Sequence, residues 1–224
     1  MRTRIKICCI QSADEARLAY AAGADAIGLV SDMPSGPGPI PDSQIRTVIS
    51  AFPDGMSVLL SSRTSSDAIC EQVSDCRPAA LQLVDDVSPE IRESVKAEFP
   101  DLTIIQVVHV KCAEAKSALA EAVPRADMLL LDSGNPDAVT GRQLGGTGQV
   151  HDWSLSARII RNCPIPVWLA GGLIPENVGK AIGLTRPFGV DVCSGLRPND
   201  ALDPKILERF VSSVKTAYDV RQDH

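Results

Sequence analysis

The sequence predicts an α/β protein folded as a single (β/α)8 TIM barrel, with residues 1–224 forming one domain. Three observations support this prediction. Short apolar runs alternate with longer amphipathic segments, eight of each along the chain. Hydrophobic residues make up 44% of the 224 residues, enough for one large core, and no Pro/Ser-rich linker or charge block divides the chain. Glycine-rich turns come after the last two apolar runs, where barrels of this kind bind phosphate.

The first half of the chain contains four strand–helix units. Capping patterns support two of the helices, since Ser12 precedes Glu15 by three residues and Ser88 is followed by Pro89. The predicted strands are Arg4–Ile10, Ala24–Val30, Met56–Leu60 and Ala79–Val84. The helices that come after them are Ser12–Ala22, Asp42–Phe52, Ser66–Asp75 and Ser88–Phe99.

The second half repeats this alternation, and Asp203 followed by Pro204 marks the start of the last helix. The predicted strands are Leu102–Val108, Asp127–Leu131, Pro166–Ala170 and Phe188–Val192. The helices are Cys112–Ala122, Trp153–Arg161, Pro175–Ile182 and Asp203–Val220. A doubly wound open sheet is the alternative, but it usually has a Gly-x-Gly-x-x-Gly turn after the first strand. Here that turn reads Cys8-Cys9-Ile10-Gln11-Ser12, which favours the barrel.

Composition limits the classes of function. A net charge of −6 with scattered basic residues argues against a nucleic-acid partner. The N-terminus leads into an apolar strand without a signal-peptide core, and no apolar run reaches the length of a membrane span. We therefore expect a soluble cytoplasmic protein with no membrane partner.

The seven cysteines are dispersed along the chain. Their odd number and the lack of an export signal favour reduced thiols. There is no Cys-x-x-Cys pair, and the histidines His109, His151 and His224 lack ligand spacing, so we expect no metal site.

The segment from Leu129 to Trp153 carries the clearest functional signal. An apolar strand ends on Asp132, a glycine-rich loop comes next with Gly145, Gly146, Thr147 and Gly148, and a helix begins near Asp152-Trp153. Parallel α/β enzymes place catalytic groups at the C-terminal ends of strands, beneath such loops. Asp132 is therefore either a general acid or a helix-capping residue.

The turns after the seventh and eighth strands predict a phosphate site. Gly171 and Gly172 come after the seventh strand, and Ser194 and Gly195 after the eighth. Backbone N–H groups of two such turns can converge on one anion. The alternative is that these glycines only form tight turns.

Cys8, after the first strand, is a nucleophile, a base or a core residue. Together with Asp132 and a phosphate site at one barrel mouth, it suggests acid–base chemistry on a phosphosugar. A thiol acts as a base only as thiolate, so Cys8 needs a lowered pKa, which the nearby N-terminus of the first helix would favour.

These residues resemble the phosphoribosylanthranilate isomerase family of tryptophan biosynthesis, from the first strand to the last. The matching segments are Lys6-Ile7-Cys8, the run from Ala22 to Gly28, Gln82-Leu83, Leu131-Asp132-Ser133, Gly145-Gly146-Thr147-Gly148 with Asp152-Trp153, Leu169-Ala170-Gly171-Gly172-Leu173 with Pro175-Glu176-Asn177-Val178, and Gly189-Val190-Asp191 with Ser194-Gly195.

The resemblance implies an Amadori rearrangement of an N-(5-phosphoribosyl) amine to a 1-amino-1-deoxyketose phosphate. Asp132 would protonate the ring oxygen as general acid, and Cys8 would remove the C2 proton as general base. The loop around Gly146 would close over the phosphosugar, a small-molecule substrate. No metal or organic cofactor is implied, and the protein is expected to be a monomer or a homodimer.

The chain also departs from the family pattern. The family usually has glycine where this chain has Cys9, and glutamate where it has Arg197. The family's arginine after the second strand, which contacts the anthranilate carboxylate, is missing, because no Lys or Arg occurs between Arg17 and Arg46. Arg63, after the third strand, is a candidate replacement for that charge.

Three other functions remain open. A paralogue would act on a different phosphosugar conjugate, as the altered loop after the second strand suggests. A metal-dependent sugar-phosphate epimerase would need paired His and Asp ligands at strand ends, where His109 is the only histidine. A non-catalytic phosphosugar-binding barrel would bind the ligand without needing Cys8 or Asp132 for chemistry.

Overall fold

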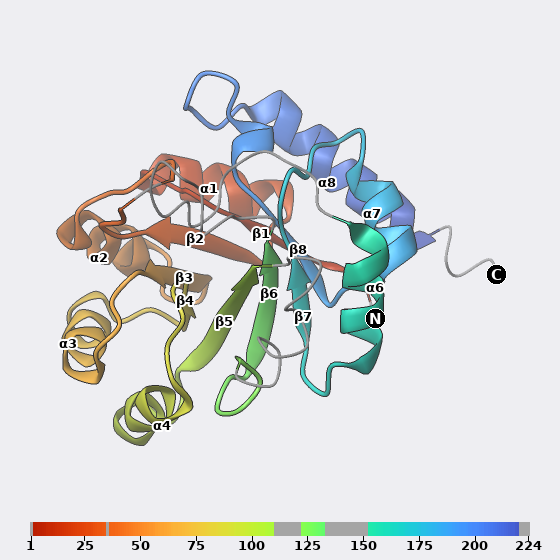
Figure 1. Ribbon diagram of the computed structural model, residues 1–224. Coiled ribbons are helices and arrows are strands. Elements are labelled where there is room, and N and C mark those ends of the chain that lie inside the picture. Colours follow the sequence, from red (N-terminus) through yellow and green to blue (C-terminus); the bar gives the residue numbers. More distant parts are fainter. Residues whose placement is uncertain (1, 35, 110–121, 133–151, 220–224) are drawn as a thin grey trace.

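Eight parallel strands close into a barrel, and the helices surround it (Figure 1). This computed structural model describes residues 2–34, 36–109, 122–132 and 152–219. The strands lie in chain order around the barrel, and pairing between β1 and β8 closes it. Their bounds are β1 Arg4–Ile7, β2 Ala26–Val30, β3 Met56–Ser61, β4 Ala80–Leu83, β5 Thr103–His109, β6 Met128–Asp132, β7 Val167–Leu169 and β8 Gly189–Val192. The predicted TIM barrel is confirmed.

The described helices come after their strands and lie on the outside of the barrel. They are α1 Ala13–Ala22, α2 Asp42–Ala51, α3 Ser66–Cys76, α4 Pro89–Glu98, α6 Trp153–Asn162, α7 Val178–Thr185 and α8 Pro204–Asp219, with a short 3-10 helix, η1, at Ser194–Leu196. Their first turns agree with the capping signals. Ser12 accepts a hydrogen bond from the Glu15 N–H, and the Asp203 carboxylate accepts from the N–H groups of Lys205 and Ile206.

Alternation along β1 separates the core from the site. Ile5 and Ile7 point outward into the apolar layer between barrel and helices, whereas Lys6 and Cys8 point into the barrel. Toward the N-terminal ends of the strands, the side chain of Trp168 fills the barrel interior. Gly189 on β8 makes room for it, because a Cβ at Gly189 would lie 2.3 Å from the Trp168 ring. Among the described residues the lower part of the barrel is therefore packed, and a cavity lies toward the C-terminal ends of the strands.

Most predicted bounds differ from the observed ones by one to three residues, and at two places the structure shows why. The first strand ends at Ile7 rather than Ile10, because Cys9 has a left-handed backbone (φ 61°) that no strand can contain. Helix α7 begins at Val178 rather than Pro175, because the Asn177 side chain accepts from the Ile174 N–H and donates to the Gly172 carbonyl, which holds a turn there. The helix predicted at Cys112–Ala122 lies almost wholly outside the described residues.

Within the described part of the chain, no helix is long and apolar enough to cross a membrane.

Candidate active site

One cavity opens at the C-terminal ends of the strands, and it brings together six of the predicted site residues. Cys8, Asp132, Gly171, Gly172, Ser194 and Gly195 all line it. Its other lining residues are Cys9, Val30, Met33, Gly36, Pro37, Leu60, Gln82, Val84, Val107, Leu130, Ala170, Leu173, Asp191, Val192 and Cys193. The predicted loop residues Gly145, Gly146, Thr147 and Gly148 lie outside the described residues.

Cys8 sits on the cavity wall just beyond β1, and its side chain is 5% exposed. Gly28 on β2 makes room for it, since a Cβ at Gly28 would lie 2.7 Å from the Cys8 sulfur. Burial raises the pKa of the Cys8 thiol to about 11, and the positive charge of Lys6 opposes that rise. A base needs a shift in the opposite direction, so the predicted lowering of this pKa is wrong for the protein without substrate.

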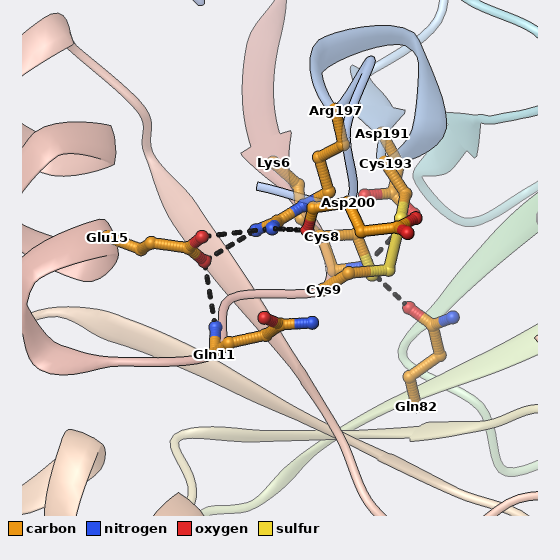
Figure 2. Close-up of a disulfide and its surroundings, with 10 residues drawn as sticks. All are labelled: Lys6, Cys8, Cys9, Gln11, Glu15, Gln82, Asp191, Cys193, Arg197 and Asp200. Atoms are coloured by element: carbon orange, nitrogen blue, oxygen red, sulfur yellow. Dashed lines mark hydrogen bonds and ion pairs between the residues drawn. A yellow bond between two sulfur atoms is a disulfide. The ribbon is translucent and has the colours of Figure 1, made fainter. Parts of the chain in front are cut away.

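A charged network lies directly beneath the Cys8 sulfur (Figure 2). The ammonium of Lys6, which is fully buried, donates to Asp191 Oδ2 at 3.0 Å and to Gln82 Oε1 at 2.9 Å, and its Nζ lies 3.8 Å from Cys8 Sγ. Burial is the largest single influence on Lys6 and lowers its pKa, but the charges and hydrogen bonds of Asp191 and Cys8 together outweigh burial and raise that pKa. The sequence alone predicts no role for Lys6, Gln82 or Asp191.

Asp191 is a lining residue of the cavity, and one of its two carboxylate oxygens, Oδ1, is buried. This oxygen has no hydrogen-bond partner among the described residues. A buried acceptor left without a donor costs free energy until a ligand supplies one. Burial raises the pKa of Asp191, against the effect of Lys6.

Asp132 is the last residue of β6 and is 9% exposed on the cavity wall. It pairs in register with His109, the last residue of β5. The position at a strand end is the one that the sequence predicted for a catalytic acid.

The two predicted phosphate turns approach each other on one side of the cavity. Gly171 and Gly172 both have left-handed backbones, with φ 90° and 62°, a conformation that favours glycine. Gly195 packs against the other turn, because a Cβ on it would lie 2.1 Å from the Leu173 carbonyl oxygen. Side chains at these positions would keep the two turns apart, so the glycines permit the close approach that a shared anion site requires.

A disulfide between Cys9 and Cys193 joins the turns after β1 and β8 (Figure 2). The expectation of reduced thiols is therefore wrong for these two cysteines. The physical reason is barrel closure: β1 and β8 are neighbours, so the turns after them meet although 184 residues separate the two cysteines. The free cysteines in the described part of the chain are Cys8, Cys70, Cys76 and Cys163.

An ion pair between Arg197 and Glu15 also connects the chain after β8 with the chain after β1, at residues that do not line the cavity (Figure 2). Arg197, after η1, donates to Glu15 of α1 at 2.6 and 3.0 Å, and its side chain is only 4% exposed. Burial raises the pKa of Glu15, but hydrogen bonds from Arg197 and from the Gln11 and Leu202 N–H groups outweigh this and lower it.

We expect Glu15→Gln to lower the free energy of unfolding at pH 7 by about 3 kcal/mol, because it leaves the buried Arg197 charge without its partner. A lowered carboxylate pKa adds stability above the unfolded-state value near 4.5, and this is lost as the pH falls through the folded-state value. Urea unfolding of both proteins from pH 7 to pH 3 measures this. The two stabilities should converge toward pH 3, and a difference that stays constant with pH would contradict the assignment.

Arg63 is not among the residues that line the cavity. Its guanidinium donates to the Ala68 carbonyl at 2.8 Å and to Asp42 Oδ2 at 3.2 Å, on the side of α2 and α3. A role in binding an aglycone carboxylate stays a prediction, and these contacts point to a local structural role instead.

We expect Arg63→Ala to change KM by less than about twofold and to lower the free energy of unfolding by at most about 1 kcal/mol, since the ion pair with Asp42 is partly exposed. Steady-state kinetics and urea unfolding measure the two effects. A rise in KM of about tenfold or more would instead assign Arg63 to the substrate carboxylate.

The described residues hold no cluster of three or more His, Cys, Asp or Glu side chains that could bind a metal ion. The groups available for chemistry are the thiol of Cys8, the carboxyls of Asp132 and Asp191 and the buried ammonium of Lys6. The backbone N–H groups of the glycine turns are candidate donors to an anion.

Comparisons with known proteins agree with this arrangement. A family model described as N-(5'-phosphoribosyl)anthranilate (PRA) isomerase matches residues 5–213. The N-(5'-phosphoribosyl)anthranilate isomerase of Methanocella arvoryzae is 33% identical over 215 residues, which cover 95% of this chain and 98% of that protein.

Solved structures give the same result. The phosphoribosyl anthranilate isomerase of Thermotoga maritima superposes with a TM-score of 0.81 at 29% identity, covering 96% of this chain and 99% of that one. A phosphoribosyl anthranilate isomerase solved in complex with reduced 1-(o-carboxyphenylamino)-1-deoxyribulose 5-phosphate gives 0.78 at 26% identity, with the same coverage. By the family match over almost its whole length, the chain belongs to the N-(5'-phosphoribosyl)anthranilate isomerase family.

Proposed function

We propose that the protein catalyses the Amadori rearrangement of N-(5'-phosphoribosyl)anthranilate to the corresponding 1-amino-1-deoxyketose phosphate, a step of tryptophan biosynthesis. The observation that carries this proposal is the cavity itself. It places the Cys8 thiol, the Asp132 carboxyl and both glycine turns around one space, in a chain that belongs to this isomerase family.

The proposed reaction needs one acid and one base. Asp132 donates a proton to the furanose ring oxygen, the bond from that oxygen to C1 breaks, and the nitrogen lone pair forms a protonated Schiff base. The Cys8 thiolate then takes the proton from C2, which gives an enolamine. This intermediate loses the proton of its C2 hydroxyl and gains one at C1, so the product is an isomer and no other reagent is consumed.

The cavity also supports binding of each part of the substrate. The turns at Gly171-Gly172 and Ser194-Gly195 supply backbone donors for the phosphate, and the carboxylate of Asp191, which also lines the cavity, can accept a hydrogen bond from a sugar hydroxyl. The side chains of Met33 and Pro37 offer an apolar wall for an aromatic ring. The solved relative bound to a reduced carboxyphenylamino-deoxyribulose phosphate is consistent with such a ligand.

One observation favours a second candidate, an isomerase for a different phosphosugar conjugate. No Lys or Arg side chain of the described residues lines the cavity, so the carboxylate of an anthranilate ring finds no cation there. A substrate whose aglycone lacks a carboxylate would bind in this cavity without leaving a negative charge unpaired.

Direct turnover of the purified protein tests the proposal. N-(5'-phosphoribosyl)anthranilate is fluorescent through its anthranilate ring, so its conversion by the wild-type protein can be followed by fluorescence.

A complementation experiment is done in parallel. The genes for the wild type, Cys8→Ala and Asp132→Asn are each introduced into a tryptophan auxotroph that lacks this isomerase. Rescue by the wild type alone supports the proposal. Failure of the expressed and folded wild type to rescue or to turn over this substrate rejects it in favour of the second candidate or of a binding role.

Cytoplasmic location, a monomeric or homodimeric state, independence of cofactors and the absence of nucleic-acid partners stay predictions.

A further inference from the structure

Lys6 is a charged residue in the interior of the barrel. It lies on β1 two residues before Cys8, so both side chains point to the same side of the strand. Lys6 is fully buried and sits one layer below the cavity, whereas Cys8 lines the cavity wall. The ammonium therefore reaches the site only through its neighbours.

The contacts of Lys6 fix its ammonium in one place. Asp191, its register partner on β8, accepts at 3.0 Å, and Gln82 from β4 accepts at 2.9 Å. These two bonds approach from different strands and leave the third donor of the ammonium facing Cys8 Sγ, 3.8 Å away (Figure 2).

Stability alone does not account for this arrangement. Interior layers of such barrels are usually filled by branched apolar residues. Burying an ammonium and a carboxylate costs several kcal/mol per ion, and their attraction often no more than offsets that cost. A pair of apolar residues would fill the same layer at least as well, so the charge has an effect elsewhere.

Four charged or titratable side chains surround the Cys8 sulfur or share its cavity. They are Lys6 on β1, Asp191 on β8, Asp132 on β6 and Arg197 after η1. The carboxylate of Asp191 disfavours a thiolate at Cys8. The guanidinium of Arg197 is bound to Glu15, and its influence on Cys8 is weaker than that of Lys6. In the described part of the chain, Lys6 is thus the cation with the strongest effect on the sulfur.

We propose that Lys6 is a positioning residue that stabilises Cys8 as thiolate, through an ammonium that Asp191 and Gln82 hold beneath the sulfur. This deepens the proposed isomerase function and rests on it. The Cys8 thiol loses its proton to solvent at the open cavity, the thiolate accepts the proton from C2 of the substrate, and Lys6 keeps its own protons throughout. Burial keeps the Cys8 pKa high without substrate, and loss of Lys6 would raise it further.

The test is the rate at which iodoacetamide alkylates Cys8, followed by peptide mass mapping at fixed pH near 9 without reductant. That rate is proportional to the thiolate fraction. Removing an opposite charge about 4 Å away shifts a pKa by roughly one unit or more, so Lys6→Met should slow alkylation of Cys8 at least about tenfold. Alkylation of Cys163, outside the cavity, should be unchanged in the same sample.

Two further variants keep the test decisive. Gln82→Leu removes one of the two partners of Lys6 but keeps the ammonium and its bond to Asp191, which still holds it beneath the sulfur, so the Cys8 rate should change by less than about threefold. Lys6→Met leaves Asp191 buried without its partner, so a second variant covers the case in which this protein does not fold. The double variant Lys6→Met/Asp191→Leu replaces the whole pair with apolar side chains, a change that folded proteins tolerate. It should still slow alkylation of Cys8, because Lys6 acts on the sulfur more strongly than Asp191.

The outcomes separate this inference from the proposed function. Folded Lys6 variants that alkylate Cys8 at the wild-type rate overturn the role of Lys6, even if the wild type is an active isomerase. Slow alkylation in the Lys6 variants supports it without any substrate, even if the wild type shows no turnover of N-(5'-phosphoribosyl)anthranilate. In an active enzyme, the limb of the pH dependence of kcat/KM that reports the ionisation of Cys8 should also move to higher pH in Lys6→Met, which a purely structural role would not produce.

Discussion

Asp132→Asn and Cys8→Ala are each expected to lower kcat for N-(5'-phosphoribosyl)anthranilate by about 1000-fold or more, with KM changed by less than about threefold. The amide of Asn has no acidic proton to give to the ring oxygen, and Ala has no group to take the C2 proton. Both changes remove interactions that form only in the transition state, so the loss falls on kcat. Steady-state fluorescence kinetics measure both parameters.

Matched controls lie elsewhere on the same framework. Asp127 is next to the start of β6, at the opposite end from Asp132, where it accepts from the Ile104 N–H and pairs with Lys96. Cys76 is a buried thiol on α3, outside the cavity. Asp127→Asn and Cys76→Ala should alter stability only, because residues at the N-terminal end or on the outer layer of a barrel do not touch its substrate. A kcat for Asp132→Asn within tenfold of the wild type would exclude Asp132 as the general acid.

The fold could be predicted because its signals are local. Each strand is a short apolar run, several helix starts carry a capping residue such as Ser12 or Asp203, and parallel strands bring the residues after their C-terminal ends to one side of the barrel. Asp132 and the two glycine turns can be recognised for that reason. The structure adds why the glycines are required, namely the left-handed backbone of Gly171 and Gly172 and the contact of Gly195 with Leu173.

The remaining features of the site depend on which strands become neighbours, and a single sequence does not state this. Lys6, Gln82 and Asp191 each interrupt an apolar run as isolated polar residues. They form a network only because closure of the barrel pairs β1 with β8 and brings β4 across the interior. Arg63 is a candidate from the sequence because it comes after a strand, yet its position cannot reveal that Asp42 on α2 binds it.

Removing the Cys9–Cys193 disulfide is expected to lower the free energy of unfolding by up to about 5 kcal/mol, because it closes a loop of 184 residues and so restricts the unfolded chain. Urea unfolding of the wild type with and without a reductant, and of Cys9→Ser/Cys193→Ser, measures the loss. Reductant should not change the double variant further. Peptide mapping under non-reducing conditions should find Cys9 and Cys193 joined, and finding both as free thiols would contradict the assignment.

The left-handed backbone of Cys9 allows a second comparison between variants that lack the disulfide. A side chain in the left-handed region costs roughly 1–2 kcal/mol relative to glycine, so Cys9 carries a penalty that the cross-link offsets. Serine at this position would keep the penalty and lose the cross-link, whereas glycine would lose both. Cys9→Gly/Cys193→Ser should therefore be more stable than Cys9→Ser/Cys193→Ser by roughly 1 kcal/mol, although neither forms the disulfide. Equal stability of the two variants would mean that the turn after β1 relaxes once it is released from β8, and that the disulfide itself holds Cys9 in this conformation beside Cys8.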